Sequence, residues 1–293
     1  MCVEHFDLIV IGSGPAGRRA AIQAAKLGRS VLVIEKRLRL GGVSVHTGTI
    51  PSKTLRETVL NLSGWRERGF YGLSYRVKKD IDGKDLGARL QKTLDYEIEV
   101  LEHQFARNGV ETCAGLARFL DPHQIAVKDG HGQERAYKAD KIIIAVGSTP
   151  FRPKSIPFEA DNIYDSDYVA SEPRVPRSLT VVGAGVIGIE YATIYSALDV
   201  PVTIVEPRRN FLEFIDREII EEFIHDLRKR GIQFRLGARV DSVEIDAQAG
   251  PSASFPTDGG YGAKCCSIAP VEPGRRPGSA LRNANSHPTI AAV

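Results

Sequence analysis

A glycine pattern occurs twice in this chain and constrains its fold more than any other feature. The segment at 12–17, Gly-Ser-Gly-Pro-Ala-Gly, recurs at 183–188 as Gly-Ala-Gly-Val-Ile-Gly, at an offset of 171 residues. An isolated match to this pattern is weak evidence, because glycine marks turns of many kinds. Two copies at a fixed offset indicate that a structural unit is repeated, so the chain is expected to contain two similar domains.

The residues around each copy indicate what the unit is. The first copy stands between apolar runs at 8–11 and 30–35, with an alanine-rich stretch of helix formers between the glycines and the second run. The second copy is flanked in the same way by the runs at 179–182 and 202–206. Each copy therefore predicts a strand, a glycine turn, a helix and a second strand, which is the arrangement of a dinucleotide-binding unit.

The glycines have distinct tasks in such a unit. The first permits the tight turn, the second lets a pyrophosphate approach the backbone, and the third lets the helix pack closely, while the helix N-terminus faces the phosphate charge. The candidate cofactor-binding glycines are accordingly Gly12, Gly14 and Gly17 in the first unit and Gly183, Gly185 and Gly188 in the second.

An acidic residue ends the second strand of both units. Glu35 follows the last glycine of its set by 18 residues, and Glu206 follows its own by the same number. This is the distance at which a carboxylate accepts a hydrogen bond from a ribose hydroxyl. The alternative, a solvated acid at a strand end, explains one such residue more easily than two matched ones, so the pattern predicts two bound dinucleotides.

The rest of the chain fits an α/β protein of two Rossmann-like, three-layer domains. Apolar residues at helical spacing predict helices at 51–64, 84–108 and 216–230, and short β segments are expected between 110 and 146. We expect a FAD-binding domain at 1–150 and an incomplete NAD(P)-binding domain at 151–249, since few strands follow residue 236.

The segment 250–293 differs in composition from what precedes it. It contains 6 Gly and 6 Pro among 44 residues and shows no apolar periodicity. Such a segment buries too little apolar surface to offset the entropy of ordering its backbone, so we expect a disordered, non-homologous tail, with the domain preceding it truncated.

Composition also limits the partners and the compartment. The formal net charge is +3 and no basic block occurs, which argues against nucleic acid as a partner. Four cysteines in 293 residues are too few for a disulfide scaffold. No apolar run approaches the ~20 residues of a membrane-spanning helix, and the start has no basic, signal-like region, so we expect a cytoplasmic protein without membrane contact.

Three segments resemble a known family. They are Gly-Gly-Val-Ser-Val-His-Thr-Gly-Thr-Ile-Pro-Ser-Lys at 41–53, Ile-Ala-Val-Gly-Ser-Thr-Pro at 144–150, and Gly-Ala-Gly-Val-Ile-Gly-Ile-Glu at 183–190. Together they resemble the flavoprotein disulfide reductases with two dinucleotide folds, and the match extends over roughly residues 5 to 247. The resemblance implies FAD as cofactor, NAD and NADP as substrates, and a homodimer, whose interface domain we expect to be absent here.

The chain departs from most of that family at one place. The redox-active cysteine pair of the family aligns with Ser44 and Thr49, and neither side chain can form a disulfide or a thiolate. The segment from Gly48 to Glu57 resembles the soluble, Si-specific pyridine nucleotide transhydrogenase branch. That resemblance implies that hydride passes from NADPH to flavin N5 and then to NAD⁺, without a protein nucleophile.

The resemblance also implies roles for individual residues. Lys53 and Glu190 match a pair that lies beside flavin N5 in the family, where the cation stabilises charge on the reduced flavin, so we expect the two side chains to lie together as the catalytic pair. The alternative for each is a solvated helix residue. The remaining candidates for cofactor binding are Lys36, Gly42, Ser44 and Gly147 on the flavin side and Arg208 on the nicotinamide side.

The choice between the nicotinamide nucleotides stays open at the level of sequence. Glu206 favours the free 2′-hydroxyl of NAD, whereas Arg208 and Arg209 could attract the 2′-phosphate of NADP, or could be solvated loop residues. Alternatives to the transhydrogenase are a diaphorase or dihydrolipoamide dehydrogenase relative, and a non-catalytic nucleotide-binding fragment. If the chain lacks the later segments of its relatives, weak flavin retention and low activity are expected.

Overall fold

The computed structural model describes residues 3–154, 156–160, 162–171, 173–240, 242–246, 250–255, 263–265 and 289–292. The chain divides into two compact units. The first contains Met1–Pro51 and Gln91–Thr149, and the second contains Ser52–Leu90 and Pro150–Val293. Helices α3 (Thr49–Leu62) and α5 (Gly83–Arg107) each cross this division, so residues 52–90 are part of the second unit although they precede most of the first unit's strands.

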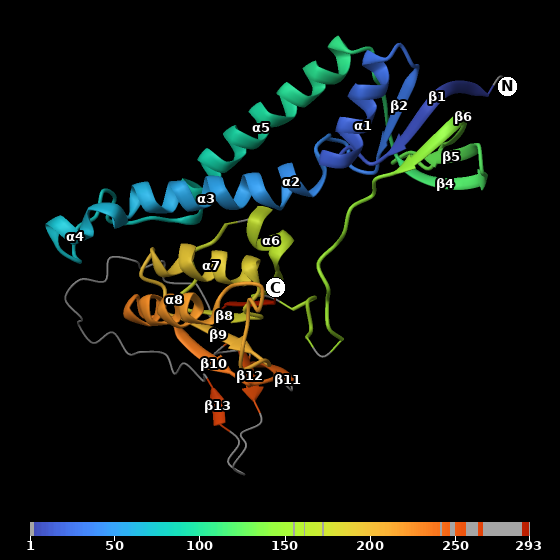
Figure 1. Cartoon of the computed structure of the whole chain (residues 1–293). Coiled ribbons are helices and arrows are strands. Elements are labelled where there is room, and N and C mark those ends of the chain that lie inside the picture. The colour runs from blue at the N-terminus through green and yellow to red at the C-terminus, as the bar shows by residue number, and fades with distance from the viewer. Residues whose placement is uncertain are drawn as a thin grey trace. The chain divides into compact units, whose positions relative to one another are not determined.

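The first unit has a mixed sheet at its centre. Its elements are β1 (Glu4–Ile11), α1 (Pro15–Lys26), β2 (Val31–Glu35), α2 (Gly42–His46), β3 (Glu111–Ala114), β4 (Leu116–Asp121), β5 (Gln124–Lys128) and β6 (Glu134–Ile144). The strand order is β3-β2-β1-β6-β5-β4. The first four strands in this order run parallel to one another, and β5 and β4 are antiparallel (Figure 1).

Both faces of this sheet are covered, which explains the unbroken apolar runs of its strands. All five residues of β2 are buried. Val31 and Val33 pack with the residues of α1 and α5 on one face, whereas the alternate residues Leu32 and Ile34 pack with Ile125 on the other. This alternation follows the two-residue period of a strand and fixes the register that brings the end of β2 to the glycine turn.

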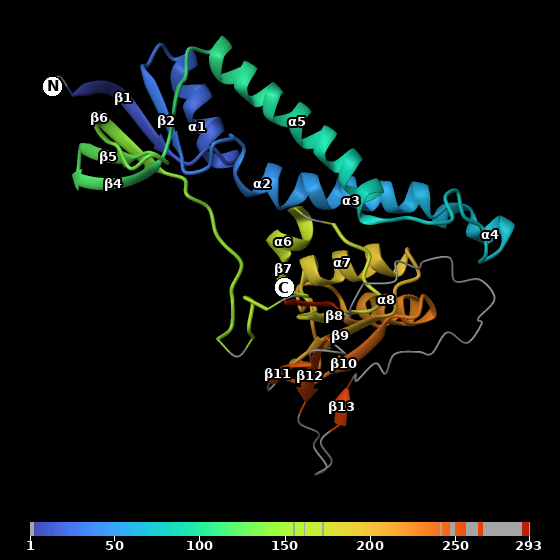
Figure 2. The ribbon, with the colours of Figure 1, turned by 180° about the vertical axis from the view of Figure 1, so that it is seen from behind.

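The second unit repeats the strand–turn–helix–strand core. Its elements after the division are η1 (Trp65–Glu67), α4 (Arg68–Tyr71), β7 (Ile163–Asp165), α6 (Ser166–Ser171), β8 (Leu179–Val182), α7 (Val186–Ser196), β9 (Val202–Glu206), α8 (Arg217–Lys229), β10 (Gln233–Leu236), β11 (Ser242–Asp246), β12 (Gly250–Phe255), β13 (Ala263–Cys265) and β14 (Thr289–Ala292). One sheet has the order β10-β9-β8-β14-β7, and β11, β12 and β13 form a small antiparallel sheet (Figures 1 and 2).

A large hydrophobic core joins the second unit's helices to its sheet. Tyr191 and Ile194 of α7, Leu227 of α8 and Ile204 of β9 belong to it, together with Leu55 of α3. Helix α8 begins where the Asp216 carboxylate accepts from the amide of Glu218 at 2.9 Å, and it ends on basic residues, as the helix dipole favours. The contact with α3 explains why residues 52–90 belong to this unit.

The architecture confirms the α/β, Rossmann-like fold expected from the repeated glycine pattern. Residues 134–144, where only short β segments were expected, form one continuous strand, because β6 pairs with β5 over residues 134–138 and with β1 over residues 137–144. Strand β7 and helix α6 were not expected at all.

Within the segment expected to be disordered, the structure describes three short strands. They are β12, β13 and β14, and the last of them pairs in parallel with both β7 and β8. Most of that segment, at 256–262, 266–288 and 293, lies outside the described residues. Among the described residues, no helix is both long and apolar enough to cross a bilayer.

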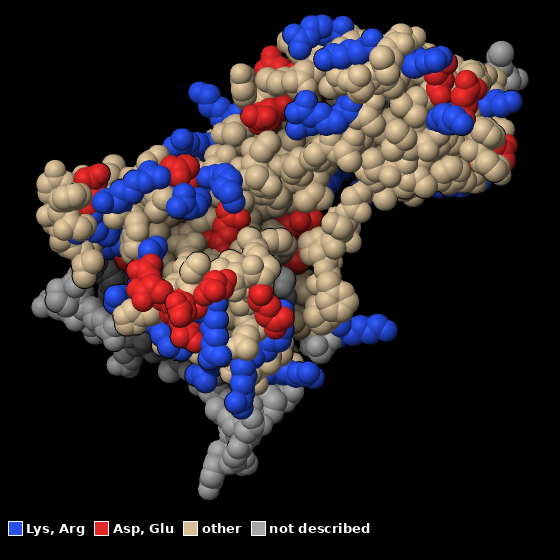
Figure 3. Space-filling model, viewed as in Figure 1, with Lys and Arg blue, Asp and Glu red and all other residues tan. Residues whose placement is uncertain are grey.

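Surface charge is mixed on the face shown in Figure 3. Lys and Arg side chains alternate there with Asp and Glu side chains, in agreement with the small formal net charge of +3. Exposed side chains also form ion pairs, such as Arg118 with Glu134.

Candidate functional site

The two glycine turns have the same backbone shape. Gly12 and Gly183 have φ angles of +106° and +111°, a region that favours glycine. A Cβ atom on Gly17 would lie 1.9 Å from the carbonyl oxygen of Gly12, and one on Gly188 would lie 2.3 Å from that of Gly183. The first and third glycines of each set are therefore required for the turn and for helix packing, as the sequence predicts.

The middle glycines lie at open helix ends. A Cβ atom on Gly14 or Gly185 would meet no other atom within 4 Å. These residues are the N-caps of α1 and α7, and within the described part of the chain neither helix end receives a side-chain cap. Uncapped amide groups at the positive end of a helix dipole suit a pyrophosphate, so both turns fit a dinucleotide.

Two further atoms near the first turn support this fit. Arg18 Nε and Thr47 Oγ1 are buried polar atoms without a hydrogen-bond partner among the described residues. A buried polar group without a partner is costly, and a bound cofactor is one way to satisfy it. The residues present in the first unit are thus compatible with a FAD molecule.

Glu35 binds the first glycine turn through hydrogen bonds to its carboxylate. Its side chain is buried and its Oε2 accepts from the amide of Ser13 at 3.0 Å and from the hydroxyl of Ser13 at 2.5 Å. Its Oε1 accepts from the amide of Arg37 at 3.2 Å. The Ser13 hydroxyl in turn accepts from the amide of Gly41 at 2.9 Å. Glu35 therefore joins the glycine turn to the loop that precedes α2.

Glu206 has the corresponding position in the second unit. Its Oε2 accepts from the amide of Ala184 at 2.8 Å, and its Oε1 accepts from the amide of Arg208 at 3.0 Å. The Arg208 side chain also binds this carboxylate with two nitrogens: Nε donates to Oε1 at 2.7 Å and a terminal nitrogen donates to Oε2 at 3.2 Å. The predicted residues Glu206 and Arg208 thus form one group.

Burial and hydrogen bonding act in opposite directions on both acids. Burial alone would raise the pKa of Glu35, but the hydrogen bonds from Ser13 and Arg37 outweigh it and lower the pKa below its ordinary value. The pKa of Glu206 is lowered in the same way, because the hydrogen bonds from Arg208 and Ala184 outweigh burial. Both groups are therefore carboxylates at neutral pH, which is the form that accepts hydrogen bonds from ribose hydroxyls.

The expected contact between Lys53 and Glu190 is confirmed. Lys53 of α3 donates from Nζ to Oε1 of Glu190 on α7, and both residues belong to the second unit. The Glu190 side chain is 18% exposed and that of Lys53 is 60% exposed. The pair therefore lies at the surface of its unit with the cation outermost, and its catalytic role stays a prediction.

The other predicted flavin-side residues lie around the first turn or beyond it. Gly42 opens α2 and comes so close to the turn that a Cβ atom there would lie 2.8 Å from the Cα of Gly14. Ser44 lies in α2 and donates to the carbonyl of Gly41 at 3.2 Å. Lys36 is exposed directly after Glu35, and Gly147 follows β6 with a φ of +70°.

Ser13, Arg37 and Ala184 are the site residues that sequence reasoning missed. Ser13 and Ala184 occupy equivalent places within the two glycine patterns, and Arg37 and Arg208 occupy equivalent places after the two acids. A comparison of the two copies position by position could have singled them out. Arg209 was the other arginine that could attract a 2′-phosphate. Its side chain lies next to Gly237, where a Cβ atom on that glycine would be 3.5 Å from the Cγ of Arg209.

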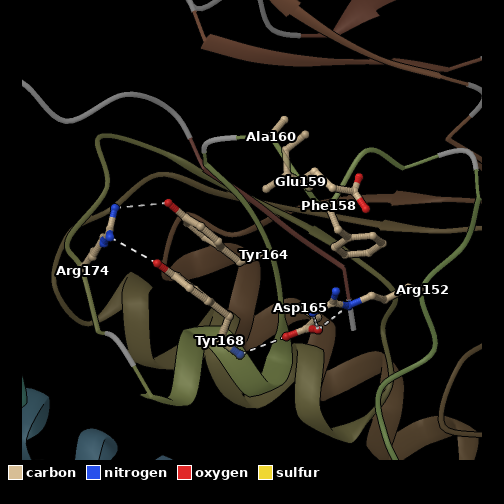
Figure 4. A pocket seen from close by; sticks show the side chains of 9 residues that line it. Arg152, Phe158, Glu159, Ala160, Tyr164, Asp165, Tyr168 and Arg174 are labelled. Atoms are coloured by element: carbon tan, nitrogen blue, oxygen red, sulfur yellow. Dashed lines mark hydrogen bonds and ion pairs between the residues drawn. The ribbon is translucent and has the colours of Figure 1, made fainter.

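The second unit also contains a pocket whose lining includes none of the predicted site residues. It has a volume of about 210 Å³. Tyr164 and Tyr168 stack there with ring centroids 4.4 Å apart, and Arg174 donates to both phenol oxygens (Figure 4). Asp165 accepts from Arg152 at 2.7 Å. Glu159 also lines this pocket.

The described residues contain no cluster of His, Cys, Asp and Glu side chains that could hold a metal ion.

Two α/β units, each with a glycine turn and a buried acid, define the class of proteins with two dinucleotide-binding folds. The chain belongs to the pyridine nucleotide-disulphide oxidoreductase family, whose model matches residues 6–286. FAD with NAD(P)H is the cofactor pair of this family.

Within this family, the curated relatives with similar sequences are soluble pyridine nucleotide transhydrogenases. The soluble pyridine nucleotide transhydrogenase of Mycobacterium bovis BCG is 47% identical over 244 residues, which are 83% of this chain and 52% of that protein. The same enzyme of Chromohalobacter salexigens is 38% identical over 84% of this chain and 53% of its own length. That of Vibrio parahaemolyticus is 36% identical over 83% and 52%. The chain spans about half the length of the curated relatives it matches.

Solved structures show the same fold. A copper(II) complex of the HOCl-induced flavoprotein disulfide reductase RclA of Escherichia coli covers 100% of this chain and 56% of its own, with a TM-score of 0.76 and 21% identity. Another structure of the same Escherichia coli reductase, RclA, covers 86% of this chain and 53% of its own, with a TM-score of 0.72 and 24% identity. These matches confirm the fold, and the sequence relatives confirm the resemblance to the transhydrogenase branch.

Proposed function

We propose that this chain carries the flavin-binding and nicotinamide-binding parts of an enzyme that transfers hydride between NADPH and NAD⁺ through FAD. The observation that carries the proposal is the presence of two equivalent dinucleotide turns in a chain with Ser44 and Thr49 at the positions of the family's redox cysteines. Two turns can hold two dinucleotides. Because positions 44 and 49 carry no thiol, hydride would pass directly between the nicotinamide ring and the flavin ring. The names of the sequence relatives support the same reaction.

In this proposal the first unit holds FAD. The amide groups at the start of α1, next to the open space at Gly14, bind the pyrophosphate. Glu35 accepts a hydrogen bond from a ribose hydroxyl. Gly42 brings α2 next to the turn, and Lys36, Ser44 and Gly147 are the remaining candidate contacts. The second unit holds the nicotinamide nucleotide in the same way, with the start of α7 on the pyrophosphate and Glu206 with Arg208 at the adenosine ribose.

Lys53 and Glu190 provide the charge that the reaction needs. Bound FAD would supply a ring that takes a hydride from one nicotinamide and gives it to another. Lys53 offers a fixed cation to negative charge that develops on the acceptor, because its ammonium is held by Glu190. Glu190 is a positioning residue, being mostly buried and contacting the Lys53 ammonium directly.

Steady-state assays with the purified full chain and added FAD test this proposal. We expect reduction of thio-NAD⁺ by NADPH that depends on FAD, and no reduction of lipoamide by NADH. Lipoamide reduction without thio-NAD⁺ reduction would instead support a dihydrolipoamide dehydrogenase relative. A chain that binds nucleotide but transfers no hydride to either acceptor would be a non-catalytic binding fragment, and the proposal would be wrong.

Assembly and location stay predictions of the same proposal. The resemblance implies a homodimer for the family, and the composition predicts a cytoplasmic location for this chain, as described above. Sedimentation of the purified chain and fractionation of the producing cells would measure these two properties independently of activity.

A further inference from the structure

Thr47, in the first unit, has a buried hydroxyl to which the described residues offer no partner. Its Oγ1 is buried and makes no hydrogen bond within the described part of the chain. A threonine hydroxyl has one hydrogen to donate and two lone pairs with which to accept, so its hydrogen-bonding capacity is unused. A buried hydroxyl without a partner is costly, and its presence needs an explanation, such as a group that binds there.

The backbone next to Thr47 does not account for this hydroxyl. The amide of Thr47 donates to the carbonyl oxygen of Val43 at 3.0 Å, and the amide of Gly48 donates to the same oxygen at 2.7 Å. These two amides use both lone pairs of that oxygen, so the hydroxyl cannot donate to it as well. The hydroxyl of Ser44 in the same helix, by contrast, donates to the carbonyl of Gly41 at 3.2 Å.

The start of α2 is fixed against the first glycine turn. The amide of Gly41, the residue before the helix, donates to the hydroxyl of Ser13 at 2.9 Å. A Cβ atom on Gly42 would lie 2.8 Å from the Cα of Gly14, so the backbones of the helix and the turn are in contact. The position of α2 relative to a pyrophosphate bound at the turn is therefore set by the fold.

The end of α2 is held as well. His46 donates from Nε2 to the carbonyl oxygen of Leu40 at 2.9 Å, which joins the last residue of the helix to the loop before it. Thr47 follows directly and lies five residues after Gly42. At a rise of 1.5 Å per residue, its backbone is about 7 Å along the helix from the contact with the turn. The hydroxyl therefore lies beyond the part of a dinucleotide that the turn itself binds.

The direction of α2 indicates which half of FAD its end faces. Glu35, the proposed partner of the adenosine ribose, binds the Ser13 hydroxyl, which accepts from Gly41 directly before the helix. The start of α2 is therefore on the adenosine side, and Thr47 is at the opposite end. The other half of FAD consists of ribitol and the flavin ring, whose hydroxyls, carbonyl oxygens and ring nitrogens all form hydrogen bonds.

We propose that the Thr47 hydroxyl binds the ribityl-flavin half of FAD, which supplies the hydrogen-bond partner that the described residues do not. This inference rests on the proposed function, in which the first unit holds FAD. Thr47 is then a binding residue for the half of the cofactor that carries the reacting ring, whereas the glycine turn and Glu35 bind the adenosine and pyrophosphate half.

Fluorescence titration of the full chain with FAD, with ADP as a competitor, tests the inference. ADP has the adenosine and pyrophosphate of FAD but neither ribitol nor flavin, and as a competitor it reports only on the site that FAD occupies. For Thr47→Val, which replaces the hydroxyl with a methyl group, we expect the dissociation constant for FAD to rise about three- to tenfold, as the loss of one hydrogen bond predicts. The inhibition constant for ADP should stay within about twofold of the wild-type value.

The stability of the chain without FAD gives a second readout. Thr47→Val removes a buried hydroxyl that has no partner, so the free energy of unfolding should stay the same or rise. Thr58→Val is the matched control, because Thr58 is also buried but its hydroxyl donates to the carbonyl of Thr54 at 2.7 Å. We expect this control to leave the constants for FAD and ADP within about twofold.

Two smaller variants keep the test valid if valine is not accommodated at position 47. Thr47→Ser retains the hydroxyl and Thr47→Ala does not, so these two variants differ from each other by the hydroxyl alone. We expect Thr47→Ser to bind FAD about three- to tenfold more tightly than Thr47→Ala, with equal inhibition constants for ADP.

The outcomes distinguish this inference from the proposed function. If the wild-type chain binds no FAD, the flavin role of the first unit is wrong, and the inference is wrong with it. If the wild-type chain binds FAD and Thr47→Val leaves its constant unchanged, a water molecule satisfies the hydroxyl, and only the inference is wrong. Equal weakening of FAD and ADP would place the effect on the adenosine half or on the fold, and would also overturn the inference.

Discussion

Lys53 Nζ donates to Glu190 Oε1 although the two residues are 137 positions apart in sequence. Both lie in the second compact unit, because residues 52–90 pack on α7 and not on the strands that follow them in sequence. Glu190 is the fifth residue of α7 and lies two residues after Gly188, the last glycine of the second turn. The contact therefore places a cation at the same helix that begins at the nucleotide turn.

Replacing this cation should affect transfer more than folding. For Lys53→Met we expect the rate of flavin reduction by NADPH to fall about tenfold or more, since a charge fixed at a reacting centre contributes several kcal/mol of stabilisation to the transition state. The free energy of unfolding should change by no more than about 1 kcal/mol, because Lys53 is exposed. Anaerobic stopped-flow spectroscopy with added FAD measures the rate, and Lys92→Met, at an exposed residue of α5, is the control.

The glycines of the first turn should separate into two classes. Gly17→Ala would place a Cβ 1.9 Å from the Gly12 oxygen, so we expect a loss of about 1–3 kcal/mol in stability together with a loss of FAD binding. Gly14→Ala meets no neighbour within 4 Å, so stability should change by less than about 1 kcal/mol while FAD binds more weakly. Chemical denaturation and flavin fluorescence titration measure the two properties, and equal stability losses in both variants would contradict this account.

Ser13→Ala should destabilise the first unit. The Ser13 hydroxyl links Gly41 and Glu35, so its removal leaves the buried Gly41 amide without that acceptor. We expect a cost of about 1–3 kcal/mol in the free energy of unfolding. Ser44→Ala removes only a donor to the partly buried Gly41 carbonyl and should cost less. A smaller loss for Ser13→Ala than for Ser44→Ala in urea denaturation would show that the link is unimportant.

The acid sensitivity of the chain should depend on Glu206. Its pKa in the folded state lies below the ordinary 4.5, so its contribution to stability is complete above about pH 4.5 and is lost as the pH falls through the lower folded value. Glu206→Gln removes this titration. We therefore expect the variant to lose less stability than the wild type between about pH 6 and pH 3.5, as measured by denaturation at each pH.

Much of the fold could be predicted because local patterns and tertiary structure agree. The apolar runs before and after each glycine turn are buried on both faces in the parallel sheets, as at β2, so hydrophobicity alone locates them. Strand β7 and helix α6 have only three and six residues, too short for a periodic pattern. The placement of 52–90 in the second unit depends on long-range packing of residues such as Leu55, which no local pattern encodes.

The candidate site was predictable where a motif fixes both residue type and spacing. The six glycines and the two acids follow from such a motif, and so does the juxtaposition of Lys53 with Glu190 through the resemblance. The occupation of Glu35 by Ser13 and of Glu206 by Arg208 was not predictable in this way. Which side chain reaches each carboxylate, the Ser13 hydroxyl or the Arg208 guanidinium, depends on the folded positions of these side chains.

In the reaction that we propose for this chain, hydride passes between two nicotinamide nucleotides through flavin without a thiol. Anaerobic titration of the FAD-loaded full chain, after its cysteines have been blocked with iodoacetamide, measures this transfer. We expect one equivalent of NADPH to remove the visible absorbance of the flavin and NAD⁺ then to restore it. Bleaching that NAD⁺ cannot reverse, or that disappears when the cysteines are blocked, would contradict the account.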